Sequence, residues 1–219
     1  MASGIEFKHA YYPESDGKPM GETDEHRQEM VRHIELLEYF FRGQQVYVSG
    51  NLLLYYEQGN PRKFVVPDAF IAKGLSHRPR RIYKVWVEGK APDLVIETTS
   101  RKTRRKDMTE KPAIYARLGV KELFLFDPDE EYLEPPLQGH RLAGTGFVAI
   151  VPESDGSLMS QELGLRLGVG EGHLQFVHPE TGERLLTGAE RAEREAEARR
   201  ALEVEVARLR DALARQTPL

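Results

Sequence analysis

The pattern of apolar and polar residues near the N-terminus has a helical period. Within residues 23–42, apolar side chains recur every three or four positions, as they do on the buried face of an α-helix. Thr23 or Asp24 can cap the free N–H groups at the start of this helix. Gly43 can end it. The pattern predicts a helix whose buried face carries Met30, Ile34, Leu37 and Phe41.

Strand patterns follow the helix. Three β-rich runs and one turn signal predict an antiparallel meander; the runs are residues 46–49, 52–55 and 64–72, and the turn is residues 59–61. Farther along, residues 94–98 and 120–126 have strand composition and flank a helical segment that ends near Leu118. A strand–helix–strand unit of this kind favours parallel pairing of its two strands.

The composition changes after Asp127 and again near residue 189. Short apolar runs separated by Gly and Pro predict an antiparallel extension, with a hairpin turn at residues 179–182. Residues 189–216 are almost wholly Ala, Glu, Arg and Leu, which predicts a charged helix. Its apolar seam is too short to predict a stable coiled coil, so self-association and a helix that packs back or stays in solvent are both open. The seam consists of Leu202, Val206, Leu209 and Leu213.

These elements predict an α/β protein with a domain over residues 1–188 and a C-terminal helix over residues 189–219. The 219-residue chain has no cysteine, which excludes disulfides, thiolate zinc sites and cysteine nucleophiles. It shows no export signal and no apolar run of about 18 residues, so we expect a cytoplasmic protein without a membrane span. The net charge of −4 argues against bulk attraction to nucleic acid but allows a local basic groove.

Candidate chemistry is concentrated in "APDLVIETTSRKTRRKDMTEKPAIYARLGVKELFLFDP", residues 91–128. Because strand side chains alternate, Asp93, Glu97 and Thr99 project from one face. Asp68, in "VVPDAFIA", stands in or at the start of a strand that can lie alongside. Two carboxylates at neighbouring strand ends repel each other unless a cation lies between them, and an all-oxygen ligand set favours Mg²⁺. The alternatives are a turn role for Asp68 and an exposed edge strand for Glu97.

Basic residues follow the acidic strand. They form either a solvated segment or a surface that holds a phosphate backbone: Arg101, Lys102, Arg104, Arg105 and Lys106. Lys111 shares a helix face with Asp107 and Tyr115, four residues away on either side. This lysine is either aimed at the strand ends or engaged in an ordinary surface pair with Asp107.

These segments resemble the Uma-type restriction endonuclease-like family, a branch of the PD-(D/E)XK nuclease superfamily. The resemblance runs from about residue 22 to residue 183 and implies an initial helix, a mixed β-sheet and a crossover helix around a nuclease-type metal site. It implies that Asp68, Glu97 and the carbonyl of Thr98 bind Mg²⁺ or Mn²⁺, and that Lys111 positions or activates water. The first helix of the family brings a polar residue toward the site, here Glu22 or His26. Further candidates are Asp93, Thr99 and Tyr115.

The sequence departs from the family pattern in two places. Thr99 occupies the position of the lysine in the ancestral E-x-K arrangement, so the resemblance requires a lysine displaced onto the helix, as in relatives of this branch. Pro112 lacks a backbone N–H and would kink the helix if it lay beyond the first turn. A helical start capped by Thr109 would remove this problem. If Lys111 pointed elsewhere, Lys106 or Lys102 would replace it.

The sequence therefore predicts a metal-dependent endonuclease that hydrolyses phosphodiester bonds in DNA. One alternative is a catalytically inactive DNA-binding or accessory module with the same fold. Another is an interaction protein that recruits a partner through its C-terminal helix. Cutting both strands requires two active sites, which a homodimer or sequential nicking would provide.

Overall fold

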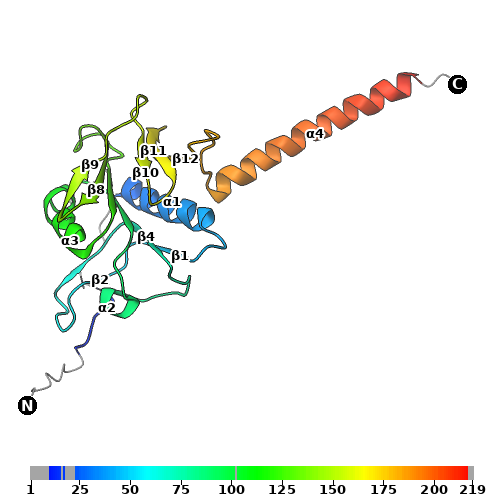
Figure 1. Cartoon of the computed structure of the whole chain (residues 1–219). Coiled ribbons are helices and arrows are strands. Elements are labelled where there is room, and N and C mark those ends of the chain that lie inside the picture. The colour runs from blue at the N-terminus through cyan, green and yellow to red at the C-terminus, as the bar shows by residue number, and fades with distance from the viewer. Residues whose placement is uncertain (1–9, 16, 18–22, 102, 217–219) are drawn as a thin grey trace, which may run out of the picture. The chain divides into compact units, whose positions relative to one another are not determined.

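The computed structural model describes residues 10–15, 17, 23–101 and 103–216. The chain divides into two units, residues 1–185 and residues 186–219. The first unit is a mixed α/β fold that contains the predicted initial helix, mixed sheet and crossover helix (Figure 1).

A six-stranded sheet forms the centre of the first unit. Its third and fourth strands are parallel, and the other neighbours are antiparallel. The parallel pair is joined by a helical crossover, η1 (Lys106–Glu110) and α3 (Lys111–Leu118), which confirms the predicted strand–helix–strand unit. In spatial order the strands are β1 (Val46–Ser49), β4 (Ala69–Lys73), β6 (Leu94–Thr98), β7 (Glu122–Phe126), β8 (Leu137–Ala143) and β9 (Gly146–Ala149).

The predicted meander forms only in part. Residues 54–55 and 64–65 pair antiparallel on either side of the predicted turn at residues 59–61, but residues 46–49 pair with residues 70–73. The run expected over residues 64–72 is broken at Pro67, which has no N–H to continue a ladder. Its first half therefore pairs in one sheet and its second half in another, where β4 lies beside β1. The smaller sheet comprises β2 (Leu54–Tyr55), β3 (Phe64–Val65) and β5 (Tyr83–Lys84), and the short helix α2 (Val85–Glu88) follows it.

The predicted antiparallel extension is present. It consists of β8 and β9 in the central sheet and of a separate three-stranded sheet. The hairpin turn expected at residues 179–182 is present, because the N–H of His178 donates to the Glu183 carbonyl oxygen at 2.9 Å and Val177 and Arg184 form an isolated antiparallel bridge. The separate sheet contains β10 (Leu158–Ser160), β11 (Leu165–Gly170) and β12 (His173–Val177).

Helix α1 (Asp24–Phe40) confirms the first predicted helix. Thr23 caps it, because its Oγ1 accepts a hydrogen bond of 3.2 Å from the N–H of His26. The helix packs on the same face of the central sheet as β10–β12, around Leu37, Ile96 and Phe176. Glu29 ties the helix to β12, since His173 Nδ1 lies 2.6 Å from Glu29 Oε1.

Two apolar cores, one on each face, hold the central sheet. Alternate residues of β6 point into each of them: Leu94 and Ile96 into the core beneath α1, and Val95 into the core beneath α3. Tyr115 of α3 is fully buried in the second core. The sheet is thus covered on both faces, and any polar side chain of β6 is held in a dry environment.

Helix α4 (Gly188–Gln216) makes up most of the second unit. A capping box begins it: Thr187 Oγ1 accepts from the N–H of Glu190 at 3.2 Å, and Glu190 Oε2 accepts from the N–H of Thr187 at 2.6 Å. Its large apolar side chains are exposed to solvent. Within the described part of the chain, no helix combines the length and apolar character that crossing a bilayer requires.

One buried carboxylate joins the central sheet to the separate sheet. Glu122 of β7 is fully buried, and its oxygens accept hydrogen bonds from the Arg141 guanidinium at 2.8 Å and from the Ser160 hydroxyl at 2.5 Å. The N–H groups of Gln161 and Glu162 also donate to it, at 3.0 and 3.1 Å. This single carboxylate therefore accepts hydrogen bonds both from β8 and from the end of β10, and so links the two sheets.

Replacing Glu122 with Ala is expected to lower the free energy of unfolding by about 3 kcal/mol, because it leaves a cation and several buried donors without an acceptor. Urea denaturation at pH 7 measures this change. Glu38→Ala is the matched control, since Glu38 lies on the exposed face of α1. Equal stability of the Glu122 variant and the control would contradict the assigned role.

Candidate active site

Asp68 is held at the end of β4 by a close backbone approach. A Cβ atom at Gly50 would lie 1.9 Å from the Asp68 carbonyl oxygen, so only glycine fits beside it. The side chain is fixed as well, since Asp68 Oδ2 accepts a hydrogen bond of 2.7 Å from the N–H of Thr98. His26 Nε2 lies 3.1 Å from the same oxygen, which brings α1 to the site as expected.

Glu97 lies in β6 and is fully buried, which excludes the alternative of an exposed edge strand. Both carboxylate oxygens are engaged by the crossover helix. Lys111 Nζ donates to Oε2 at 2.7 Å, and the Tyr115 hydroxyl donates to Oε1 at 2.5 Å. The helix face that carries these two residues therefore points at the strand. Of the two alternatives that the sequence left open for Lys111, the structure shows the lysine aimed at the strand ends and not an ordinary surface pair.

Lys111 also contacts a third acid. Its Nζ lies 2.9 Å from Asp107 Oδ1 and donates to the Val66 carbonyl oxygen at 3.2 Å. Asp107 is fully buried, so it belongs to the same cluster as Asp68 and Glu97. The ammonium group of Lys111 thus contacts two fully buried carboxylates, and the charge of the third, Asp68, also acts on it.

A π-helical turn accommodates Pro112. The turn spans Lys106–Glu110, and the N–H of Lys111 donates to the Lys106 carbonyl oxygen, five residues back. The wider turn places Pro112 in the first turn of α3, where its missing N–H breaks no hydrogen bond of the α-helix. Thr109 does not cap a new helix, because its hydroxyl donates to the Arg105 carbonyl oxygen instead. Lys111 therefore reaches the site without a substitute lysine.

The cluster shifts the pKa values of its members. Burial is the largest influence on Glu97 and, with the nearby Asp68 and Asp107 charges, raises its pKa to about 8 against the opposing effect of Lys111. Burial likewise raises the pKa of Asp107. Burial also opposes ionisation of Asp68, but its hydrogen bond with His26 and the Lys111 charge bring its pKa below the ordinary value.

The pKa of Lys111 is raised. Burial works in the opposite direction, but attraction to Glu97, Asp68 and Asp107 outweighs it. Burial, followed by the Glu97 charge, raises the pKa of Tyr115, so its hydroxyl remains a donor. At neutral pH the cluster consequently contains a charged lysine and a carboxyl, Glu97, whose raised pKa favours its protonated form.

Some predicted site residues lie apart from this cluster. Asp93 begins β6 at the opposite end from Glu97 and is bound there by Lys90 Nζ at 2.5 Å and Lys121 Nζ at 2.9 Å. These lysines hold its pKa below the ordinary value against the larger effect of burial. The structure therefore does not bring Asp93 to the site. Glu22 lies outside the described residues.

The two threonines after Glu97 are fully buried. The N–H of Thr98 contacts Asp68, whereas the N–H of Thr99 donates to the Phe126 carbonyl oxygen at 2.6 Å and so continues the pairing with β7. Among the described residues, neither threonine hydroxyl has a hydrogen-bond partner. Thr99 therefore prolongs the strand and leaves the lysine role to the helix.

The basic segment leads from β6 into the π-helical turn. Arg101, Arg104, Arg105 and Lys106 are exposed, and Arg104 lies over the Tyr132 ring at 5.3 Å from its centroid. Lys102 is not among the described residues. The exposed cations stand directly before Asp107 in the chain, so a surface suited to phosphate groups adjoins the acidic cluster.

The cluster suits a divalent cation in charge and in donor type. Asp68, Glu97 and Asp107 offer oxygen ligands, and their three carboxyl groups outnumber the single ammonium of Lys111. Within the described ranges, no three acidic, histidine or cysteine side chains are already arranged around a common metal position.

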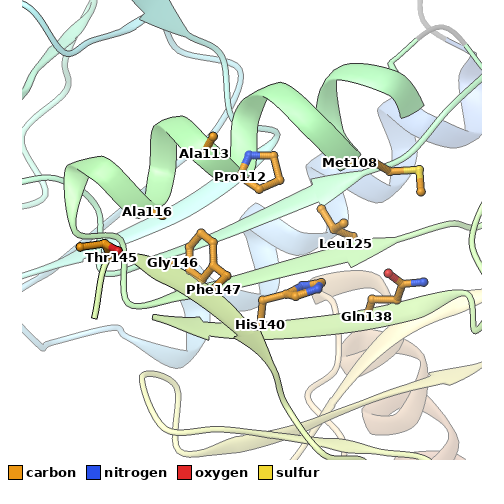
Figure 2. Close-up of a pocket in the computed structure, with 10 residues that line it drawn as sticks. All are labelled: Met108, Pro112, Ala113, Ala116, Leu125, Gln138, His140, Thr145, Gly146 and Phe147. Atoms are coloured by element: carbon orange, nitrogen blue, oxygen red, sulfur yellow. The ribbon is translucent and has the colours of Figure 1, made fainter. Parts of the chain in front are cut away.

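A cavity of about 500 Å³ lies on the neighbouring face of the crossover helix (Figure 2). Phe147 of β9 and His140 of β8 face Pro112 across it. Burial lowers the pKa of His140, so its ring is neutral at physiological pH. Among the described residues, the lining contains no carboxylate and no lysine, so the acidic cluster is the stronger candidate for catalytic chemistry. The described lining residues are Met108, Pro112, Ala113, Ala116, Leu125, Gln138, His140, Thr145, Gly146 and Phe147.

Comparison with known proteins identifies the family. The model of the Uma2 family, described as "Putative restriction endonuclease", matches residues 8–169. The chain belongs to this family. A crystal structure from Anabaena variabilis, titled "a putative nuclease belonging to DUF820", has 16% sequence identity and a TM-score of 0.47, and the match covers 67% of this chain and 76% of that chain. A search of curated proteins found no match.

Membership of the Uma2 family supports a nuclease, and hence a hydrolase, function in general terms. The sequence pattern of this Uma2 chain did not single out Asp107 as a site residue. Its spacing from Lys111 and Tyr115 was the available signal, because residues four apart share a helix face. The surrounding basic residues made a solvated pair the simpler interpretation.

The raised pKa of Glu97 predicts a pH-dependent stability for the metal-free protein. Between its ordinary value of 4.5 and about 8, the folded state keeps a proton that the unfolded state releases, so stability falls as pH rises. Glu97→Gln removes this titration. The variant should gain stability relative to the wild type across that range, by up to about 1.4 kcal/mol per pH unit.

Urea unfolding of both proteins with a chelator present, at pH 5, 6, 7 and 8, gives the two curves. Glu38→Gln serves as the control, because Glu38 is exposed and should give a constant difference from the wild type. A pH-independent difference for Glu97→Gln would mean that this carboxyl is ionised throughout.

Proposed function

We propose that this Uma2-family chain is a divalent-metal-dependent endonuclease that hydrolyses phosphodiester bonds in DNA. The observation that carries the proposal is the contact of 2.7 Å between Lys111 Nζ and Glu97 Oε2. It joins a lysine and an acid from different elements at the place where Asp68 leads into β4. Buried acids that share a cation are costly to maintain, and such groups are concentrated at functional sites.

In this proposal Asp68, Glu97 and the Thr98 carbonyl hold the metal, and Asp107 is an additional carboxylate available to it. Mg²⁺ or Mn²⁺ bound there would lower the pKa of a water molecule and neutralise negative charge on the phosphate. The ligand oxygens are oriented in advance, because His26 fixes Asp68 and the Tyr115 hydroxyl fixes Glu97.

Lys111 is the group proposed to position the attacking water. Its raised pKa keeps it charged, so it acts as a hydrogen-bond donor and electrostatic stabiliser and not as a base. Its side chain is 15% exposed, which allows contact with a substrate at the site. Asp107 and the Val66 carbonyl oxygen restrict the ammonium to a narrow range of positions.

The basic segment is proposed to hold the DNA backbone. Exposed cations immediately before the π-helical turn can bind phosphates on either side of the scissile bond. The proposal assigns this role to Arg101, Lys102, Arg104, Arg105 and Lys106.

Asp68→Asn, Glu97→Gln and Lys111→Ala are each expected to reduce Mg²⁺-dependent cleavage by about a hundredfold or more, because each removes a charge at the reacting phosphate. Conversion of supercoiled plasmid to nicked and linear forms measures this loss. Lys121→Ala is the matched control, since Lys121 binds Asp93 at the other end of β6. Circular dichroism establishes that each variant folds.

Full activity in all three variants would overturn the site assignment, and cleavage that persists in a chelator would overturn the metal requirement. Isothermal titration of Mn²⁺ supplies a second measurement that does not depend on activity. Asp68→Asn and Glu97→Gln should weaken Mn²⁺ binding, whereas Lys121→Ala should not.

A catalytically inactive DNA-binding module is the second candidate, and one observation favours it. Lys111 and Tyr115 occupy both oxygens of Glu97, so that carboxylate must exchange a partner before it binds an ion. Salt-dependent DNA binding by the wild-type protein, with neither Mn²⁺ binding nor cleavage, would select this function over the nuclease.

Replacing Arg104, Arg105 and Lys106 together with Ala is expected to weaken binding to a duplex oligonucleotide by about tenfold or more. Loss of three phosphate contacts should also reduce the slope of log affinity against log salt by up to about 3. Fluorescence anisotropy at several salt concentrations measures both quantities. Arg62→Ala with Lys63→Ala is the control, because this exposed basic pair lies in the β2–β3 turn. Equal losses in the two variants would remove the segment from the interface.

A further inference from the structure

We propose that α4 is a dimerisation element that pairs with α4 of a second copy of this chain in an antiparallel coiled coil. The inference rests on the helix alone and holds whether or not the proposed nuclease activity is correct. It selects one of the possibilities that the sequence pattern left open.

The apolar seam of α4 is exposed. Leu202, Val206, Leu209 and Leu213 have relative exposures between 46% and 67%, in a helix of 29 residues that is otherwise almost entirely charged residues and alanine. An isolated helix gains little stability in water from its own hydrogen bonds, and most helices in proteins depend on packing of an apolar face. The seam has the four-three-four spacing with which one helix buries its apolar residues against another.

The charges beside the seam fit a second copy. If Val206 is at heptad position a, Leu209 is at position d, and Glu203 and Arg210 both occupy position e. In an antiparallel pair, positions e face each other, so Glu203 lies opposite the partner's Arg210 on both sides of the interface. The face is therefore complementary to itself, which is the property that a symmetric dimer requires.

The residues N-terminal to the seam decide the orientation. Continuing the heptad upstream places Arg199 at position a and Glu195 at position d. A parallel pair would stack each of these residues on its own copy, giving two like-charge layers. An antiparallel pair centred between Val206 and Leu209 still forms four apolar layers and places both charges beyond the partner's seam.

The proposed register is specific. Leu202 packs opposite the partner's Leu213, and Val206 packs opposite the partner's Leu209. Val204 projects from a different face of the helix, although it is 69% exposed and is the same type of residue as Val206. The pair Val204 and Val206 therefore offers a matched comparison within one turn.

Sedimentation of the full chain tests the dimer. At concentrations up to about 100 µM we expect a species of twice the 25.0 kDa chain mass. Val206→Glu should shift the protein to the monomer, while Val204→Glu should leave the dimer unchanged. A monomeric wild-type protein across this range, or equal effects of the two substitutions, would overturn the proposal.

Disulfide trapping tests the orientation of the two helices. The chain has no cysteine of its own, so only the introduced cysteines can form a disulfide. A mixture of Val206→Cys and Leu209→Cys chains should form a mixed disulfide-linked dimer on mild oxidation. Leu209→Cys alone should remain unlinked. Efficient linkage of Leu209→Cys with itself would overturn the antiparallel arrangement in favour of a parallel one.

Discussion

The attraction between the Lys111 ammonium and the buried acids around it offsets the largest electrostatic cost in the first unit. That cost is the burial of several carboxyl groups close together. Glu97 and Asp107 are fully buried, and Asp68 is nearly so, in a protein that covers both faces of its central sheet with apolar side chains. Acids in such surroundings are stable only with a cation or a proton. One lysine contacts two of them directly, and a carboxyl with a raised pKa takes up part of the remaining imbalance. The three carboxyl groups outnumber the single ammonium group, and the proposed metal site rests on this excess.

Three different parts of the chain bring the side chains of this cluster together. The parallel β6–β7 pair requires a crossover, and that crossover returns the helix carrying Lys111 across the sheet. Helix α1 approaches the strand ends and brings His26 to Asp68. The π-helical turn solves a local conflict, because it admits Pro112 while keeping Asp107 and Lys111 on one face. Such turns are frequent at functional sites, where a regular helix would misplace a side chain.

Features that depend on neighbouring residues could be predicted from the sequence. The spacing of apolar residues predicted helix α1, and the strand–helix–strand composition predicted the parallel β6–β7 pair. The period of the helix placed Lys111 and Tyr115 on one face, and in the structure that face contacts Glu97. Long-range pairing could not be read in this way: β1 joins β4 and not β2, because Pro67 divides a run whose composition suggests one strand. Asp93, directly before β6, and Glu97 within it alternate onto one face, yet only the contacts from distant segments show that Asp93 pairs with Lys121 whereas Glu97 joins the cluster around Lys111.

Gly50 gives the site a steric dependence on a residue that carries no chemistry. Its backbone lies so near the Asp68 carbonyl that a single methyl group would overlap it, and the Ile34 side chain of α1 closes the same space from another side. An added side chain would push apart the strand that carries Asp68 and the helix that carries His26. Steric exclusion, and not polarity, therefore determines which residues position 50 accepts. An engineered variant with altered carboxylates at the site must still keep glycine there.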